Sequence, residues 1–199
     1  MNFKKVIGYP SFLICLVFVL VVTANDETPQ IVFGNEEEFV GKIAITIDDC
    51  ADESYLKSMI QTLIDKKIHA TLFPNTNFIV IEDKKLWQNI VDNGFEIGYH
   101  TTDHTEGKSK KQYLSDFNQF KSDFQSFTER EVKINFARPP YGVLSDDWYN
   151  FVYDENISTA WWSYVPKETS TYNSFSKVWS EKGSIILLHT NEDDNNWLT

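Results

Sequence analysis

Residues 98–106 read Gly-Tyr-His-Thr-Thr-Asp-His-Thr-Glu and contain two of the four histidines in this 199-residue chain. The turn signal Asn93-Gly94 and the short run up to Tyr99 predict a strand directly before His100. His100 and His104 then lie in a loop after a strand, where a spacing of four residues lets both imidazoles reach one ion. Taken alone, this stretch favours two solvated loop histidines, so the case for a metal site has to come from the rest of the chain.

The segments around this stretch alternate between strands and helices. Short apolar runs predict strands, and apolar residues at helical spacing, such as Leu56, Met59, Ile60 and Leu63, predict helices. Strands are expected at residues 42–47, 70–73, 95–99, 133–137, 158–163 and 184–188, and helices at about 56–64, 84–92, 111–128, 146–153 and 174–181. Helical connections between short apolar strands imply an α/β fold with a parallel sheet covered on both faces.

The N-terminus has the pattern of a secretory signal peptide. A basic start, an apolar run at residues 12–22 and a small residue at Ala24 predict cleavage after residue 24. The apolar run is shorter than the ~20 residues that span a bilayer, so we expect secretion to the cell exterior or cell wall without stable membrane insertion. Residues 25–41 are acidic and are expected to form an extended arm, and residues 42–199 are expected to form one domain.

Charge and cysteine content restrict the partners. The signal peptide holds two lysines and no acid, so its removal changes the net charge from −11 to −13. A chain this acidic repels nucleic acid. Cys15 lies in the signal peptide, which leaves Cys50 without an intramolecular disulfide partner. We expect a monomer.

Polar residues with catalytic potential lie at the C-terminal ends of the predicted strands. In a parallel barrel or open α/β sheet these ends share one rim, where active sites are built. Side chains more than 140 positions apart should therefore converge there, and the residues concerned are Asp48, Asp49, His100, Arg138, Tyr141 and His189.

This set of residues fits metal-assisted hydrolysis of an amide or ester. A carboxylate and two neutral imidazoles supply three ligands for a divalent metal and leave positions for water and substrate. Because Asp48 and Asp49 are adjacent, we expect one to be a ligand and the other a general base. Arg138 would orient that base. The N–H of Tyr141 would face a developing oxyanion, and His189 would protonate the leaving group.

Each of these residues also has a purely structural interpretation. The two aspartates could cap the next helix, Arg138 could form a buried ion pair, and His189 could be a satisfied core histidine. Cys50 is expected to be a small buried residue, and His69 fits no catalytic arrangement. A purely structural account needs all of these interpretations at once.

The same residues resemble the motifs of the polysaccharide deacetylase family, carbohydrate esterase family four, which includes chitin and peptidoglycan deacetylases. The resemblance covers roughly residues 41–191. Four segments resemble the first, second, third and fifth motifs of the family, in that order: Thr46-Ile47-Asp48-Asp49, His100-Thr101-Thr102-Asp103-His104, Arg138-Pro139-Pro140-Tyr141 and Leu187-Leu188-His189.

The resemblance implies a distorted (β/α) barrel and assigns roles to individual residues. Asp48 would be the general base, oriented by Arg138. The ligands of zinc, or of a similar ion such as cobalt, would be Asp49, His100 and His104. Tyr141 would supply the oxyanion N–H, His189 would be the general acid, and Leu187 would line the pocket for the acetyl methyl group. The implied partner is an N-acetylglucosamine polymer or oligomer, chitin-like or peptidoglycan-like, which would be converted to acetate and a free amine.

Three departures from the family pattern keep an alternative open. The fourth motif, Asp-x-x-Asp-Trp, is replaced by residues 165–169, in which Glu168 would support the catalytic histidine and Thr169 stands in place of the tryptophan; Trp161 or Trp162 would have to compensate. Cys50-Ala51 replaces the usual Gly-Pro, so the loop beside Asp48 is expected to differ. The chain stops ten residues after His189, so the barrel is expected to be incomplete. The alternative is a catalytically impaired, glycan-binding member of the fold, and a third hypothesis is amide hydrolysis of a small non-sugar substrate.

Overall fold

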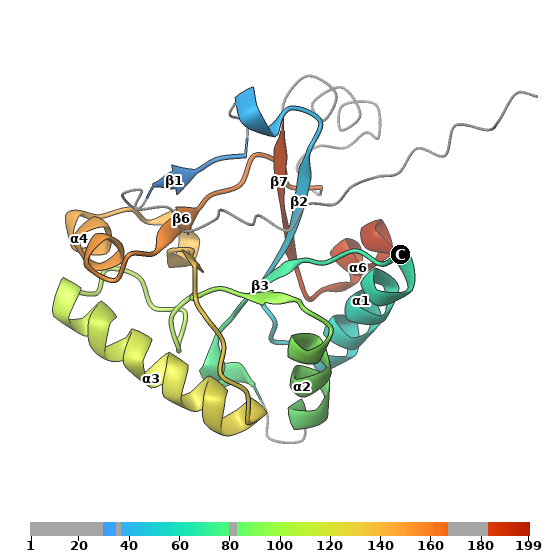
Figure 1. Cartoon of the computed structure of the whole chain (residues 1–199), viewed down its shortest axis with the longest axis horizontal. Helices are drawn as coiled ribbons and strands as arrows, with labels where there is room; N and C mark the ends of the chain where they lie inside the picture. The colour runs from blue at the N-terminus through green and yellow to red at the C-terminus, as the bar shows by residue number, and fades with distance from the viewer. Residues whose placement is uncertain (1–29, 35–36, 80–82, 167–182) are drawn as a thin grey trace, which may run out of the picture.

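The computed structural model describes residues 30–34, 37–79, 83–166 and 183–199. It confirms the predicted α/β class, because parallel strands form the centre and helices pack around them (Figure 1). The six predicted strands are present as β2 (Ile43–Asp49), β3 (Thr71–Pro74), β4 (Glu96–Ile97), β5 (Phe136–Ala137), β6 (Ser158–Ala160) and β7 (Ser184–His189). The signal peptide, Glu168, Thr169 and the helix predicted at residues 174–181 lie outside the described residues.

The strands form two parallel sheets that are joined at both sides. One sheet has the order β4-β3-β2-β7 and the other the order β1-β6-β5. Single bridges connect them, between Tyr99 and Ala137 on one side and between Tyr164 and Ile186 on the other. Backbone hydrogen bonds support both, from Tyr99 N to Phe136 O (2.9 Å) and from Leu187 N to Tyr164 O (2.9 Å). The architecture is a distorted barrel whose two seams are single bridges instead of full ladders.

Several elements differ from the sequence-based expectation. Ile31 and Val32, within the segment expected to be an arm, form β1 and pair in parallel with β6. The strands β4, β5 and β6 are shorter than predicted and contain only two, two and three residues. After β7 the chain forms an additional helix, α6 (Glu192–Leu198), which begins at the N-cap residue Asn191.

The four helices α1 (Glu53–Lys66), α2 (Lys84–Asp92), α3 (Lys110–Thr128) and α4 (Asp146–Asp154) lie close to their predicted positions. Capping side chains mark the starts of α1, α3 and α4: Asp52 accepts from Ser54 N and Tyr55 N, Ser109 and Gln112 form a capping box, and Ser145 accepts from Trp148 N. Each helix buries one apolar face, which is why period-3.6 spacing located them.

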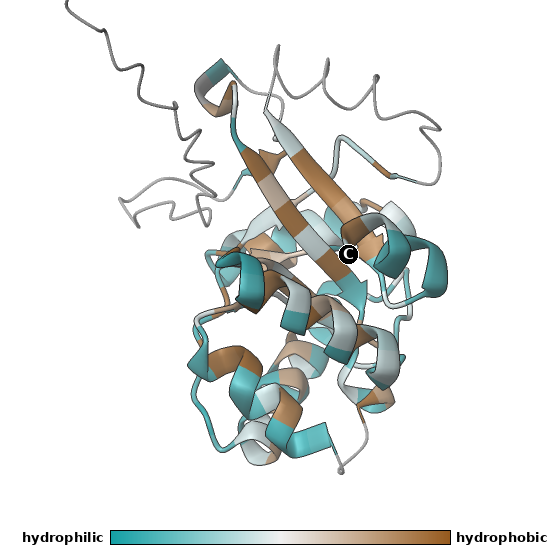
Figure 2. Ribbon diagram, turned by 90° about the vertical axis from the view of Figure 1, so that its right-hand side faces the viewer, coloured by the Kyte–Doolittle hydropathy of each residue, from teal (hydrophilic) through white to brown (hydrophobic). Residues whose placement is uncertain are grey.

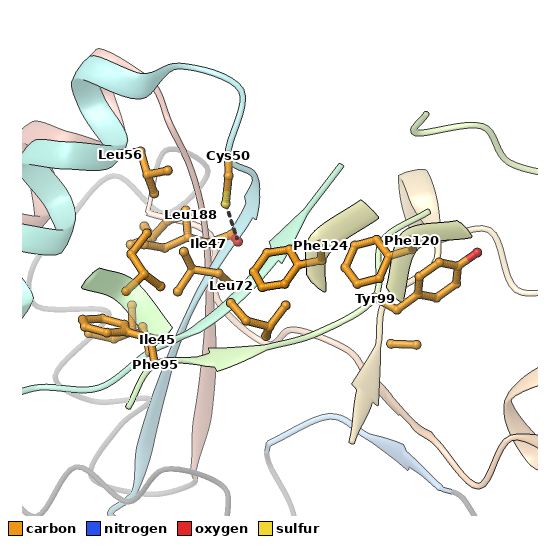
Figure 3. Packing of buried hydrophobic residues seen from close by; sticks show 14 of the residues in the cluster. Ile45, Ile47, Cys50, Leu56, Leu72, Phe95, Tyr99, Phe120, Phe124 and Leu188 are labelled. Atoms are coloured by element: carbon orange, nitrogen blue, oxygen red, sulfur yellow. Dashed lines mark hydrogen bonds between the residues drawn. The ribbon is translucent and has the colours of Figure 1, made fainter. Parts of the chain in front are cut away.

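Strand alternation divides the apolar side chains between two clusters. Ile45, Ile47 and Leu188 face the helices and belong to the large cluster shown in part in Figure 3. Phe73 and Ile185 belong to a smaller cluster that is completed by Val32, Phe136 and Ala160. Apolar residues recur along the two long strands β2 and β7 (Figure 2). The alternation places the side chains of Thr46 and Asp48 on the opposite face of β2 from Ile45 and Ile47.

Gly98 shows how tightly the inside of the barrel is filled. A Cβ atom at this position would lie 2.2 Å from Cε1 of Phe73. The Phe73 ring in turn packs 6.5 Å from the His100 ring and 4.4 Å from the Arg138 guanidinium. Only glycine lets β4 approach β3 closely enough to place His100 beside the end of β2. Among the described residues, no helix is both long and apolar enough to cross a membrane.

Candidate metal centre and active site

The C-terminal ends of β2 and its neighbours bring the predicted site residues together. Asp48 is paired in register with Phe73 of β3 and with His189 of β7. Asp48 is 3% exposed, His100 is 2% exposed and Arg138 is fully buried. The polar groups therefore meet at one buried rim, as the strand-end pattern predicted.

Asp49, His100 and His104 form a cluster that fits a metal ion. One ligand atom from each lies within 4.8 Å of the others. Oδ1 of Asp49 is 3.5 Å from Nε2 of His100 and 3.4 Å from Nε2 of His104. This oxygen is buried and has no hydrogen-bond partner among the described residues. A buried carboxylate oxygen without a partner is costly, so its position between two imidazole nitrogens favours a cation at this point.

The tautomer of His100 is set by its second nitrogen. Nδ1 lies 2.7 Å from the backbone carbonyl oxygen of Arg138. A carbonyl can only accept, so Nδ1 donates its proton there and Nε2 presents a lone pair toward Asp49. This is the tautomer that a metal ligand requires.

The pKa values of Asp49 and His104 are both shifted toward the forms that bind metal. Burial by itself raises the pKa of Asp49, but interactions with His100, His104 and His189 outweigh it, and the pKa lies below its ordinary value. Burial lowers the pKa of His104, an effect that Asp49 offsets only in part. An ionised carboxylate and a neutral imidazole are the forms that bind metal.

The loop that carries both histidines is fixed by residues that the sequence analysis did not identify. Asp116 of α3 accepts hydrogen bonds from Thr102 N (2.9 Å), Thr102 Oγ1 (2.8 Å) and Tyr99 Oη (2.8 Å). Asn75 donates from Nδ2 to the carbonyl oxygen of His100 (2.7 Å). In the sequence, Asp116 is an acidic residue at the border of the apolar face of a predicted helix. Acidic residues are common at such positions, so the sequence alone does not identify Asp116 as a residue of the site.

Arg138 holds Asp48 through a network that leaves no part of its guanidinium group exposed. Nη1 donates to Oδ1 of Asp48 (2.5 Å) and to Oγ1 of Thr46 (2.9 Å). Nε and Nη2 donate to the carbonyl oxygens of Ala160 (3.0 Å) and Trp161 (2.8 Å). The contact between Arg138 and Asp48 is thus a buried ion pair that also orients Asp48. The structural and the catalytic interpretation of Arg138 are therefore compatible.

Tyr141 lies at the mouth of the site on a short turn, η4 (Pro140–Gly142). Its side chain is 70% exposed, and its ring centroid lies 4.4 Å from that of His104. Behind it, Trp161 and Trp162 stack with centroids 4.6 Å apart. A Cβ atom on Gly142 would lie 2.9 Å from the Trp162 ring, so glycine allows this close approach. Trp162 thus lines the same rim, 5.7 Å from the Arg138 guanidinium.

His189 ends β7 and contacts an acid that was not predicted. Its Nδ1 lies 3.8 Å from Oδ2 of Asp194, and its backbone N–H donates to the same oxygen (2.8 Å). The interaction with Asp194 raises the pKa of His189 above its ordinary value, against the effect of burial. Leu187, two residues earlier on β7, is buried and shares the face of His189. Glu168, the acid expected beside His189, lies outside the described residues.

Strained backbone is concentrated at this rim. Five of the eight non-glycine residues with positive φ in the described chain belong to it: Asp49 (61°), Cys50 (56°), Thr101 (64°), His104 (56°) and Tyr141 (55°). Such conformations cost on the order of 1–3 kcal/mol each and persist where the surrounding structure enforces them. Cys50 takes the left-handed conformation that glycine would adopt without this cost, and its buried Sγ donates to the carbonyl oxygen of Ile47 (3.6 Å, Figure 3).

Fold and site together define a distorted α/β barrel with an aspartate–histidine–histidine cluster at its strand ends. The profile of the family described as polysaccharide deacetylase matches residues 37–157, more than half of the chain. The chain belongs to this family, which confirms the resemblance seen in its motifs. Its members are hydrolases that act on acetyl amides and are generally metal-dependent.

Known proteins with similar sequence or structure agree with this assignment. A peptidoglycan-N-acetylglucosamine deacetylase of Bacillus cereus is 28% identical over 162 residues, which cover 76% of this chain and 74% of the relative. The fold is similar to that of a family 4 carbohydrate esterase from Bacillus anthracis, with a TM-score of 0.68 and 22% identity over 84% of this chain and 76% of that one. It is also similar to a CE4 family pseudoenzyme from Bacillus anthracis, with a TM-score of 0.70 and 19% identity over 87% of this chain and 63% of that one.

Proposed function

We propose that the protein is a secreted, metal-dependent hydrolase that removes N-acetyl groups from an N-acetylglucosamine-containing polysaccharide, chitin-like or peptidoglycan-like. The observation that carries the proposal is the unpartnered, buried Oδ1 of Asp49, which lies near Nε2 of His100 and Nε2 of His104, beside the contact between Asp48 and Arg138. Support for the substrate class comes from the family and from the Bacillus cereus relative.

Asp49, His100 and His104 would hold the metal ion, most simply zinc, with cobalt as an alternative. When bound, such an ion lowers the pKa of a water molecule and polarises the acetyl carbonyl. The chain prepares the three ligands by the carbonyl contact to Nδ1 of His100 and by the network around Asp116.

Asp48 is the general base in this proposal. Arg138 donates to Oδ1, and Oδ2 lies 3.7 Å from Nε2 of His100, one of the three metal ligands in this proposal. Asp48 takes a proton from the attacking water while the water oxygen forms a bond to the acetyl carbon. The Tyr141 N–H stabilises the negative charge that develops on the acetyl oxygen. His189 then gives a proton to the nitrogen as the C–N bond breaks, which releases acetate and a free amine.

The sugar would bind at the rim above these groups. Leu187 lines the acetyl pocket, and the exposed Tyr141 ring and Trp162 offer apolar faces for a pyranose ring. The apolar segment at residues 12–22 supports export by a cleaved signal peptide, and the net charge of −13 after cleavage disfavours nucleic acid. The working form is a monomer outside the cell or in the cell wall.

A second function is supported by the altered fourth motif. Val165 and Thr169 stand where the family has an acid and a tryptophan. The fold is also similar to a protein described as a pseudoenzyme. In this alternative the chain keeps the metal and binds N-acetylated glycans without turnover.

Acetate release from N-acetylglucosamine oligomers by residues 25–199 tests the proposal, with metal content measured on the same sample. We expect release that a chelator stops and that zinc or cobalt restores. His100→Ala should abolish both metal and activity, whereas the control His69→Ala, outside the site, should keep both. About one metal per chain with glycan binding but no acetate would favour the binding protein. Unchanged metal content and activity in His100→Ala would refute the assignment of the site.

A further inference from the structure

The segment from His189 to Asp194 folds into a tight local unit. Asn191 caps α6 by accepting from Asp194 N (3.0 Å), and its Nδ2 donates back to Oδ2 of Asp194 (3.0 Å). The same Oδ2 accepts the backbone N–H of His189 (2.8 Å). Thr190, between them, accepts from Asp52 N at the start of α1 (3.0 Å). Asp194 is 5% exposed, although it is an acid in the first turn of a surface helix.

We propose that Asp194 is the positioning carboxylate of His189, holding the imidazole with a proton on Nδ1 so that Nε2 is directed toward the reacting atoms. The part of this inference that concerns catalysis rests on the proposed deacetylase function. The part that concerns the ring of His189 does not.

Among the described residues, Asp194 is the acid best placed for this role. The charged groups around His189 come from β2 (Asp48 and Asp49), from the histidine loop (His104) and from α6 (Asp194). Asp48 is engaged by Arg138, and Asp49 lies between two imidazoles. Of these acids, only Asp194 accepts a hydrogen bond from the backbone N–H of His189, so its carboxylate keeps a fixed place beside this residue.

The separation of 3.8 Å between Nδ1 and Oδ2 is an ion-pair distance and is longer than a hydrogen bond. Rotation of the His189 side chain, which is 42% exposed, can shorten it, whereas the buried carboxylate is fixed by its other bonds. Contacts of this kind are often long before substrate binds and tighten in the complex. An acid that holds a histidine tautomer is a recurrent device in hydrolysis.

A purely structural role for Asp194 is the competing explanation. Acids near the start of a helix stabilise it, and the reciprocal bonds with Asn191 form such a cap. Asparagine at position 194 retains the size and one acceptor oxygen for the cap but removes the charge. The variant Asp194→Asn therefore separates the two roles, and Glu192→Gln, an exposed acid in the same turn, is the matched control.

The first measurement is the state of the His189 ring by ¹⁵N NMR of residues 25–199, with and without zinc. The chain has four histidines, so the signals can be assigned with single variants. We expect neutral His189 in the wild type to carry its proton on Nδ1. In Asp194→Asn the ring should become a mixture of tautomers and titrate at lower pH, and Glu192→Gln should match the wild type. A wild-type ring protonated on Nε2 overturns the proposal even if the variant fails to fold.

The second measurement is steady-state acetate release. Asp194→Asn should lower kcat by about 10²-fold, with KM and metal content close to wild type, and should move the alkaline limb of the pH profile to lower pH. A loss of thermal stability with unchanged kcat and unchanged His189 tautomer would mean that Asp194 is only a cap. If the wild type releases no acetate, the deacetylase proposal fails, and the NMR result still decides the role of Asp194.

Discussion

The two sides of the candidate site are held in opposite ways. On the metal side, Asp48, His100 and Arg138 are almost fully buried and are bonded to one another and to β6, and Asp116 of α3 holds the loop that follows His100 through Thr102. On the acid side, the His189 side chain is 42% exposed, and the carboxylate nearest to its Nδ1, that of Asp194, lies only five positions along the chain. The metal side is therefore built into the core, whereas the acid side is a local attachment at the end of β7.

This difference has a consequence for mutation. A buried polar network stabilises the fold only while every member keeps its partners, so losing one member costs both structure and chemistry. A local and partly exposed unit can change with little effect on the rest of the fold. The sequence departs from the family pattern at residues 50–51, beside Asp48, and at residues 165–169, whereas four matching motif segments supply the rest of the site.

Replacing Arg138 should produce the largest effect. Arg138→Met leaves the charge of Asp48 buried without a partner and frees the carbonyl oxygens of Ala160 and Trp161. We expect the free energy of unfolding, measured in urea, to fall by about 3–5 kcal/mol. The matched control is the other arginine, in an exposed pair with Asp92; Arg130→Met should leave the free energy of unfolding close to the wild-type value. Equal costs for the two variants would show that the metal side is not part of the core.

The next effect concerns metal affinity without loss of the fold. Asp116→Asn removes a charge and one of the two oxygens that anchor Thr102 and Tyr99, so the histidine loop loses part of its support. We expect zinc affinity, measured by competition with a chelator, to fall by about 10–100-fold. Asp123→Asn, on the same helix but bonded to Gln119, should leave the affinity unchanged. An unchanged affinity in Asp116→Asn would mean that the loop is held by its own backbone alone.

The same contrast explains what the sequence could predict. Apolar spacing located α1 to α4, because each helix buries a face of residues at period 3.6. The strand-end rule brought Asp48, His100 and His189 to one rim, because parallel strands share the edge at which they end. The apolar spacing of a helix and the position of a polar residue at the end of a strand can both be found in the sequence without knowing which residues are in contact in the fold.

Other features depend on contacts that no local pattern encodes. The two residues of β1 are too few for a period, and they form a strand only because β6 offers an open edge. Asp116 lies on α3 and accepts a hydrogen bond from the loop that carries both histidines. The path of that loop depends on the strained backbone at Thr101 and His104. Asp194 lies in a helix that the sequence analysis missed, although Asn191 and Asp194 have the spacing of a capping pair.

The smallest expected effect tests the acid side through the pH dependence of stability. The pKa of His189 is raised in the folded state, so its contribution is fully present below the unfolded value of about 6.5 and is lost as pH rises through the folded pKa. The pKa of Asp194 is lowered: burial raises it, but bonds to His189 and Asn191 outweigh burial. Its contribution is therefore present above about pH 4 and is lost in acid.

The total pH dependence cannot isolate this pair, because the lowered pKa of His104 has the opposite sign and adds stability as pH rises. The difference between wild type and Asp194→Asn, measured in urea with a chelator present, removes that contribution. We expect the variant to be less stable by up to about 1 kcal/mol near pH 5.5, since the exposure of His189 screens the interaction. The difference should shrink toward about pH 8.5. A difference that stays constant with pH would mean that Asp194 stabilises α6 as an uncoupled cap, and that His189 stands at the rim without a charged partner from this segment.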